Sequence, residues 1–330
     1  MQTLQVAMFD WLARGVSDRA RRLDPFSLWA ERVGRQLAEP AFQRDASFLK
    51  ALVPLMQLFS RYFDAEVRDL DRVPQQGAAL LVGNHSGGGL TPDTSAVFAA
   101  WYAERGFDRP LIGLGFDAAF TVPLIGSVMR RMGQVPASVE NAGRALDEGL
   151  PVLVYPGGDH ELFRPWLERN RIDLAGRKGF IRLALAKRVP VVPVVGHGGH
   201  DSLIVLLRSE RLAEWLGLKR IRMGNLPIVW QLPWGVSLPG PFYIPMPAKI
   251  TVQVCEPLDW SAHGPEAANN PEIVDRCYAE ITEVMQGTLS ALARENPWPV
   301  IRRLRSLLPG VKRETRRARP ARRPRRPPGS

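Results

Sequence analysis

The stretch AALLVGNHSGGGLTPD, residues 78–93, joins an apolar run to a glycine-rich turn and then to a helix start. The run from Ala78 to Gly83 carries no polar side chain, as expected of a strand buried on both faces of a sheet. Thr91 and Pro92 are typical of a helix cap and of the first helical position. The stretch predicts a strand–loop–helix unit of an α/β fold, with His85 in the loop where sites of such folds form.

Short apolar runs alternate with helical patterns along the rest of the chain. We expect strands at 66–70, 111–116, 133–136, 152–155, 191–195 and 249–254. We expect helices at 91–103, 139–148, 178–187 and 271–294. This alternation predicts an α/β fold, a layered mixed sheet flanked by helices, preceded by an N-terminal helical segment.

The N-terminal segment, residues 1–63, has the spacing of amphipathic helices. Its second part, FLKALVPLMQLFSRYF at 48–63, is more apolar and contains Pro54, a kink position. Two interpretations are open: helices packed on the core, or helices that rest in a membrane surface. The first part favours core packing, and the wide apolar face of the second favours contact with membrane or substrate.

The charge of the chain is concentrated at its C-terminal end. The net charge is +11, yet residues 302–330 hold twelve Arg or Lys and one acid, which leaves 32 basic and 32 acidic residues elsewhere. Residues 301–330 are rich in Arg and Pro, so we expect a disordered polybasic tail. Three interpretations of this tail are open: a solvated extension with no specific role, a patch that binds anionic phospholipid, or a nucleic-acid contact. Without interleaved aromatics, no specific nucleic acid is expected.

Residues 223–248 contain no charged side chain but six prolines and four aromatics. Such a proline density excludes a helix, so we expect a long loop. Either it folds over the core, or it dips into a bilayer or lines an acyl-chain channel. No window is apolar enough over about 18–20 residues to span a membrane. The opening residues lack a secretory signal, and the two cysteines lack metal-ligand spacing, which favours a reducing cytoplasmic setting.

Three clusters could carry chemistry. His85 could act as a general base, and Asp93, separated from it by seven residues, could fix its tautomer, with glycines that let the chain turn back. From local sequence alone, a satisfied loop histidine and a helix-start charge explain the pair equally well. A second cluster, Tyr155 to Glu161, also follows a buried strand. A third, Arg177-Lys178-Gly179-Phe180, offers cations at a helix start, a phosphate site or simply a solvated basic turn.

The order of these blocks resembles the glycerolipid acyltransferase family, which includes the bacterial lysophosphatidate acyltransferases. The blocks are Asn84-His85, GQVPAS (133–138), Tyr155-Pro156-Gly157-Gly158, the Arg177 helix start, and the proline-valine strand at 191–195. The likeness extends over about residues 64–259. The family places four residues between the histidine and the aspartate, so the loop here is three residues longer.

Two further departures from the family pattern point to one branch of the family. The second block lacks the family's arginine, and Arg144 is the nearest one. Pro156-Gly157-Gly158 replaces the usual Pro-Glu-Gly-Thr-Arg. With Glu161 and GRKGFIRLALAKRVPVVPV (176–194), it is similar to the type-two diacylglycerol acyltransferase branch, which acylates neutral acylglycerols.

The resemblance implies a membrane-associated O-acyltransferase domain over residues 64–300. It implies acyl-CoA, or another acyl thioester, as substrate, and a glycerolipid hydroxyl, of a lysophospholipid or an acylglycerol, as acceptor, without metal or cofactor. His85 is the expected general base and Asp93 its partner. The residues expected to bind substrate are Asn84, Ser86, Gly87, Gly88, Tyr155, Pro156, Gly157, Gly158, Glu161, Arg177 and Lys178. The loop 223–248 and the tail 302–326 are expected to dock the enzyme on the anionic cytoplasmic leaflet.

A non-catalytic lipid-binding or membrane-tethering protein on the same fold is the alternative, because the lengthened loop and altered blocks could mean lost activity. The discriminating observation is whether Asp93, or another acid, comes within hydrogen-bond reach of His85.

Overall fold

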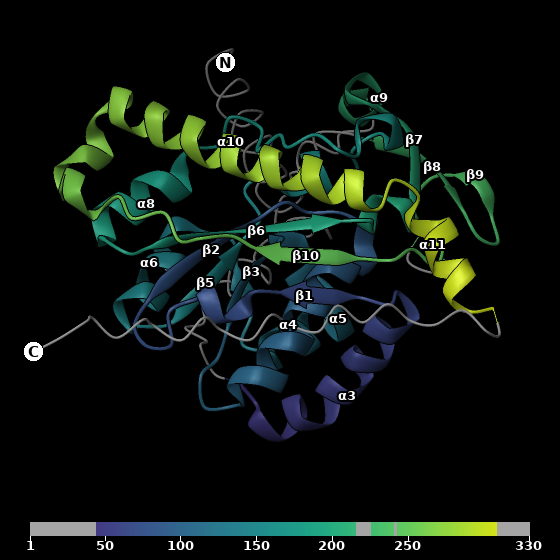
Figure 1. Cartoon of the computed structure of the whole chain (residues 1–330), viewed down its shortest axis with the longest axis horizontal. Helices are drawn as coiled ribbons and strands as arrows, with labels where there is room; N and C mark the ends of the chain where they lie inside the picture. The colour runs from purple at the N-terminus through teal and green to yellow at the C-terminus, as the bar shows by residue number, and fades with distance from the viewer. Residues whose placement is uncertain (1–43, 216–225, 241–242, 309–330) are drawn as a thin grey trace, which may run out of the picture.

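Strand β2 (Ala79–Gly83) lies in the middle of a seven-stranded sheet in the computed structural model, which describes residues 44–215, 226–240 and 243–308. The spatial order is β1-β10-β6-β2-β5-β3-β4 (Figure 1). The five strands from β6 to β4 are parallel, whereas β10 is antiparallel to β6 and parallel to β1. The expected mixed sheet is therefore confirmed.

The other six strands of this sheet all lie close to the apolar runs that predicted them. They are β1 (Glu66–Arg68), β3 (Ile112–Gly115), β4 (Val135–Pro136), β5 (Pro151–Val154), β6 (Val191–His197) and β10 (Thr251–Val254). The α-helices of the described ranges are α3 (Ala46–Tyr62), α4 (Pro92–Arg105), α5 (Pro123–Arg131), α6 (Val139–Asp147), α7 (Gly158–Leu162), α8 (Gly179–Lys187), α9 (Glu210–Trp215), α10 (Pro271–Glu295) and α11 (Pro299–Ser306).

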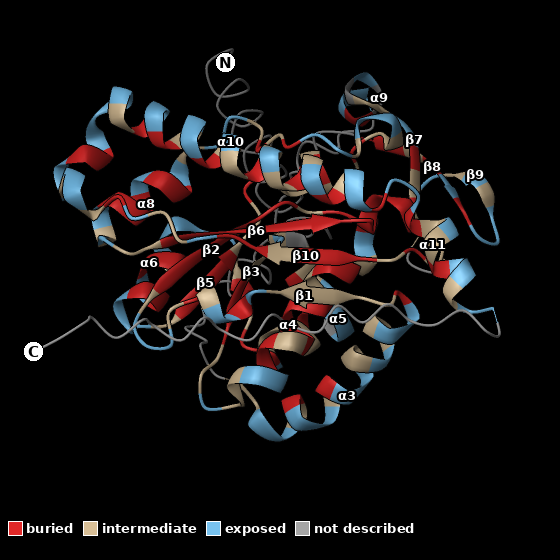
Figure 2. Ribbon diagram, viewed as in Figure 1, coloured by how far each residue is buried: buried red, intermediate tan, exposed pale blue. Residues whose placement is uncertain are grey.

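Helices cover both faces of the sheet, which explains the unbroken apolar character of β2. Leu80 and Val82 point to the core shared with α6, α8 and α10. Ala79 and Leu81 point to the opposite core, shared with α3 and α4. Successive strand residues face opposite sides, so a strand between two helix layers must be apolar at every position. Figure 2 shows the central strands as buried along their whole length.

Helix α10 forms one wall of the fold. Asn270 caps it by accepting hydrogen bonds from the backbone amides of Glu272 and Ile273. The helix buries one apolar stripe against the sheet, made of Val274, Cys277, Ile281, Met285, Leu289 and Leu292. The expected long amphipathic helix is confirmed, and both cysteines of the chain are buried free thiols.

Helix α3 matches the second N-terminal segment, with Pro54 inside it. Leu49 and Val53 are buried on the core next to α4, whereas Leu55 and Leu58 are exposed. The helix therefore packs on the core with one face and leaves an apolar face open. The part of the N-terminal segment up to residue 43 lies outside the described residues. None of the described helices has the length and apolar character needed to cross a membrane.

The expected long loop over 223–248 is wrong for its described part. A small antiparallel sheet forms there from β7 (Ile204–Ser209), β8 (Leu226–Gln231) and β9 (Gly235–Ser237). Its own small core joins Leu203, Val205 and Val229. Pro227 lies within β8, and Pro233 lies in the turn that leads to β9. Pro227 is tolerated because β8 pairs there with β7 alone, and its pairing with β9 involves only residues 229–231. Residues 223–225 and 241–242 lie outside the described part.

The expected disordered tail is also wrong at its start, because α11 begins at Pro299 and runs to Ser306. Arg303 is buried and donates hydrogen bonds to the carbonyl oxygens of Arg61 and Tyr62, at the C-terminal end of α3. A cation satisfies carbonyls that a helix end leaves unpaired, so this contact orders the segment. Residues 309–330 lie outside the described part.

Two buried histidines predict how the fold responds to acid. Burial lowers the pKa of His197 to about 4 and that of His200 to about 3, from an ordinary 6.5. Below pH 6.5 the unfolded chain binds protons that the folded chain excludes, so stability falls as the pH drops toward 4. We expect His197→Gln to reduce the loss of unfolding free energy between pH 7.5 and 4.5 by on the order of 2 kcal/mol. Urea unfolding at both pH values measures this. The exposed His263→Gln variant should lose as much as wild type, and an equal loss in His197→Gln would refute the prediction.

Candidate active site

His85 and Asp93 come together at the carboxyl edge of the sheet. His85 follows β2, and Asp93 lies in the first turn of α4. The Nδ1 atom of His85 is 3.6 Å from the Oδ2 atom of Asp93, an ion-pair distance slightly longer than a hydrogen bond. The imidazole is 15% exposed, whereas the carboxylate is buried. With Nδ1 facing the acid, Nε2 lies on the opposite side of the ring, where a substrate proton could be accepted.

The Asp93 carboxylate is held on both oxygens. Oδ2 accepts hydrogen bonds from the backbone amide and the hydroxyl of Ser86, and Oδ1 accepts one from the Thr94 amide. Burial alone raises the pKa of Asp93, but His85 and these hydrogen bonds outweigh it and lower the pKa below its ordinary value. The carboxylate is therefore ionised at neutral pH. The expected Thr91 cap is absent, because Thr91 adopts a left-handed conformation and its side chain makes no cap bond.

The glycines account for the longer loop. Gly88–Leu90 form one turn of 3₁₀ helix, and a single turn absorbs three residues, the length by which this loop exceeds the family spacing. Gly87 and Gly88 have φ of +82° and +62°, a region that other residues rarely adopt. A side chain at Gly87 would also strike Pro92, and one at Gly88 would strike Leu203. The turn therefore needs glycine at both positions and returns the chain to His85.

Tyr243 holds the glycine turn from outside. Its hydroxyl donates to the carbonyl oxygen of Gly87 at 3.0 Å and accepts from the amide of Leu90 at 3.4 Å. Burial raises the pKa of Tyr243 to about 12, so the phenol stays neutral and keeps its proton for the first bond. The sequence interpretation named this tyrosine only as one aromatic of the uncharged segment and missed its contact with the site.

Tyr155 sets one face of the imidazole. Its ring stacks on His85 with centroids 4.2 Å apart and planes 16° apart. Gly83, the last residue of β2, makes room for it, because a Cβ there would collide with the tyrosine ring. Burial, with the nearby Asp93 charge, raises the pKa of Tyr155 well above its ordinary value. The expected site residue Tyr155 is therefore a neighbour of His85.

Three expected substrate contacts face inward instead. The amide of Asn84 donates to and accepts from the backbone of Gly196 in β6, so it joins two strand ends. Ser86 is buried against Asp93. Glu161 is buried too, and its Oε2 accepts the backbone amide of His85 at 3.2 Å. Polar groups this deep are used by protein partners, so we propose that all three position the His85 loop. Their expected contact with substrate stays a prediction.

Glu161 has a strongly perturbed carboxyl. Burial raises its pKa to about 8, although Arg164, whose Nη2 is 3.3 Å from Oε1, favours the charged form. The same burial lowers the pKa of Arg164. Arg164 is itself buried, and the sequence interpretation missed it, because nothing local marks an arginine three residues beyond a glutamate as its buried partner.

The Tyr-Pro-Gly-Gly block and the basic helix start lie side by side. Arg177 is half exposed, and its Nη1 donates to the carbonyl oxygen of Pro156 while its Nη2 donates to Asp159. A side chain at Gly158 would meet that guanidinium, and one at Gly157 would meet Glu161. Lys178 instead turns to Asp275 of α10, with Nζ and Oδ1 2.6 Å apart. The two cations thus point to different partners.

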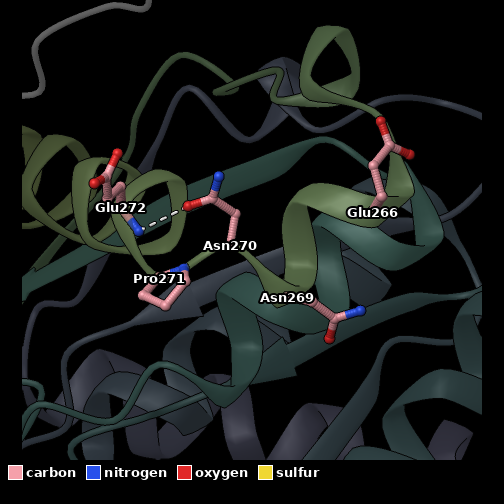
Figure 3. Close-up of a pocket in the computed structure, with 5 residues that line it drawn as sticks. All are labelled: Glu266, Asn269, Asn270, Pro271 and Glu272. Atoms are coloured by element: carbon pink, nitrogen blue, oxygen red, sulfur yellow. Dashed lines mark hydrogen bonds between the residues drawn. The ribbon is translucent and has the colours of Figure 1, made fainter.

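No metal cluster marks another site in the described part, and a hollow lies away from the His85 loop. There, no three His, Cys, Asp or Glu side chains are placed to hold a metal ion. A hollow of about 650 Å³ is lined by Glu266, Asn269, Asn270, Pro271 and Glu272 (Figure 3). It lies where α10 begins, and Figure 1 shows the start of α10 at the end of the sheet opposite to the one toward which β6 points. Because β2 is parallel to β6, this is the end away from His85.

Comparisons with known proteins match the part of the chain that contains this site. The Acyltransferase family profile matches residues 64–196, the part that contains His85, Asp93 and the Tyr155 block. An uncharacterized protein of Mycobacterium tuberculosis is 31% identical over 254 residues, which cover 76% of this chain and 68% of that protein.

Two further relatives have named activities. Phytyl ester synthase 1 of Arabidopsis thaliana is 23% identical over 69% of this chain and 34% of its own length. The human 2-acylglycerol O-acyltransferase 3 is 29% identical over 36% of each chain. The chain belongs to the glycerolipid acyltransferase family, and it is an acyltransferase enzyme.

Proposed function

We propose that the protein moves a fatty acyl group from acyl-CoA, or another acyl thioester, to the hydroxyl of an acylglycerol or a lysophospholipid at a membrane surface. The observation that carries the proposal is the contact of His85 with the buried, ionised Asp93, 3.6 Å apart despite the longer loop. A histidine with one nitrogen toward a fixed carboxylate has the other free for proton transfer.

In the proposed reaction, Nε2 of His85 accepts the proton of the acceptor hydroxyl as its oxygen attacks the thioester carbonyl. The negative charge on the carbonyl oxygen of the tetrahedral intermediate is held by backbone amides, for which those of the Gly87–Gly89 turn are candidates. The carbon–sulfur bond then breaks, and the leaving thiolate takes the proton from His85. Asp93 stabilises the imidazolium throughout, and the ester and free thiol are the products.

A neutral acceptor is favoured over a phosphate-bearing one. The block GQVPAS lacks the arginine that its family counterpart supplies, which removes a partner for an acceptor phosphate. Two relatives carry names that refer to uncharged acceptors, a 2-acylglycerol and the alcohol of a phytyl ester. We therefore place an acylglycerol first and a lysophospholipid second.

For the donor, we propose that Arg177 contacts the phosphates of CoA. Its guanidinium is half exposed beside the Pro156–Gly158 turn. Its neighbour Lys178 is paired with Asp275 and would have to leave that carboxylate to contribute. Arginine suits phosphate because its planar fork presents several donors at once.

The membrane contact is proposed for the β8–β9 hairpin and the tail 302–326, with the enzyme peripheral on the cytoplasmic leaflet. The hairpin region exposes large apolar side chains: Leu232, Trp234, Val236, Leu238 and Ile244. Tryptophan on such a surface suits the level of the lipid headgroups.

Removal of the proposed base tests the reaction. His85→Ala should lower acyl transfer by about 10³-fold, since a positioned general base contributes on the order of 10²–10⁴-fold. Thiol release from acyl-CoA, in detergent with a panel of acylglycerols, lysophospholipids and long-chain alcohols, measures it. The exposed His263→Ala variant should keep wild-type activity. Equal turnover in His85→Ala and wild type would overturn the mechanism, and the panel identifies the acceptor.

A shortened acyl donor tests the proposed contact between Arg177 and the phosphates of CoA. We expect Arg177→Gln to raise KM for acyl-CoA about ten-fold, as expected for loss of a charge-assisted contact, with kcat nearly unchanged. With acyl-pantetheine, which lacks the nucleotide phosphates, the variant and wild type should have the same KM. Arg276→Gln, an exposed arginine of α10, is the matched control. The same KM increase with both donors would mean that Arg177 acts only by holding Pro156.

A further inference from the structure

Helix α11 is amphipathic in the reverse sense to a normal surface helix. Its exposed stripe contains Ile301, Leu304 and Arg305 at helical spacing, and Leu308, two residues beyond the helix, continues it; all but Arg305 are apolar. The buried residues of the helix are Pro299 at its start and a cation, Arg303, on the side opposite to the stripe. A surface helix ordinarily turns its apolar stripe to the core and its charges to water.

Arg303 explains why the helix is held in this orientation. Its guanidinium donates to the carbonyl oxygens of Arg61 and Tyr62 and to the hydroxyl of Ser306, at 2.7 to 2.9 Å. The partner carbonyls end α3, where the helix dipole favours a cation. The two bonds to the end of α3 therefore fix α11 on the domain, and they leave its apolar stripe outward.

The start of α11 continues this apolar surface toward the small sheet. Trp298, just before the helix, is exposed, and the carbonyl oxygen of Pro299 accepts the amide of Lys249. Lys249 lies two residues before β10, and β10 pairs with the carboxyl end of β6, so α11 begins at the edge of the sheet that carries His85. Figure 1 shows α11 at the end of the sheet toward which β6 points.

The charges beside the stripe decide which partner fits it. Arg302 and Arg305 flank the apolar residues, and residues 309–330, which follow directly, contain nine Arg or Lys and one acid. A second copy of this chain would place two such basic segments face to face, which like-charge repulsion opposes. An anionic bilayer matches both features, because its acyl region accepts the apolar stripe and its headgroups attract the cations.

We propose that α11 is an interfacial anchor, which inserts Trp298, Ile301, Leu304 and Leu308 into an anionic lipid surface and orients the carboxyl edge of the sheet toward it. The proposal deepens the proposed function, in that it names the element that brings the site to a lipid acceptor. Arg305 lies within the stripe and reaches the headgroups with its charged end, as long cationic side chains do at interfaces.

Vesicle co-sedimentation of the purified full chain tests the anchor. Vesicles of phosphatidylcholine with 30% phosphatidylglycerol should bind wild type, and Ile301→Ser/Leu304→Ser should bind at least ten-fold more weakly. The matched pair of single variants is Ile301→Ser, 45% exposed on α11, and Val139→Ser, 61% exposed on α6. Only the first should weaken binding. High salt should reduce the binding of wild type without abolishing it, because the apolar part is not screened.

Three results would overturn the proposal. The first is unchanged vesicle binding by Ile301→Ser/Leu304→Ser. The second is equal loss in Val139→Ser. The third is a dimer in lipid-free sedimentation that the double variant converts to monomer, which would make the stripe a self-interface.

Turnover in detergent separates this proposal from the proposed function. The double variant should keep wild-type acyl transfer on detergent-dispersed substrate while it loses vesicle binding. A chain that binds vesicles through α11 but transfers no acyl group would refute the reaction and leave the anchor standing.

Discussion

The carboxylate of Asp93 is the point on which the geometry of the site depends. It is buried at the start of α4, receives the amide and hydroxyl of Ser86, and lies 3.6 Å from His85. A buried charge is costly unless it is hydrogen-bonded and paired, and these contacts supply both. The same contacts fix the turn between β2 and α4, because Ser86 belongs to the loop and Asp93 to the helix. Local fold and proposed chemistry thus share one interaction.

Three further contacts hold the ring and the loop of His85 in place. Tyr155 stacks on the ring, Glu161 accepts the His85 amide, and Asn84 joins the end of β2 to Gly196 of β6. Tyr155 and Glu161 both follow β5, the second of them in α7, whereas Asn84 follows β2 itself. A central parallel strand therefore does more than bury apolar surface, since its neighbours deliver polar groups to one edge.

Sequence patterns predicted the layers of the fold and the pair of His85 and Asp93. They did not predict in which direction the polar side chains near this pair point. Apolar runs located the strands, because only a strand between two helix layers is apolar throughout. His85 and Asp93 were recognised from block order. The inward orientation of Asn84, Ser86 and Glu161 was missed, since a polar residue after a strand can face substrate or protein equally well. The hairpin at β8 was missed because prolines were read as a loop.

The start of the tail was missed for a different physical reason. Its composition predicts disorder, yet Arg303 donates to the carbonyl oxygens of Arg61 and Tyr62 at the end of α3, more than 240 residues away in sequence. Local composition has no information about such a contact. The same contact turns the apolar side of α11 outward. Because the tail was predicted to be disordered, the sequence did not predict this exposed apolar surface.

The most direct test of the account is a double-mutant cycle of His85→Ala and Asp93→Asn in single-turnover acyl transfer. If Asp93 acts only through His85, the double variant will be no slower than His85→Ala alone, although Asp93→Asn by itself is slow. Additive losses, with each substitution reducing the rate independently of the other, would contradict the claim that the two residues form one catalytic unit.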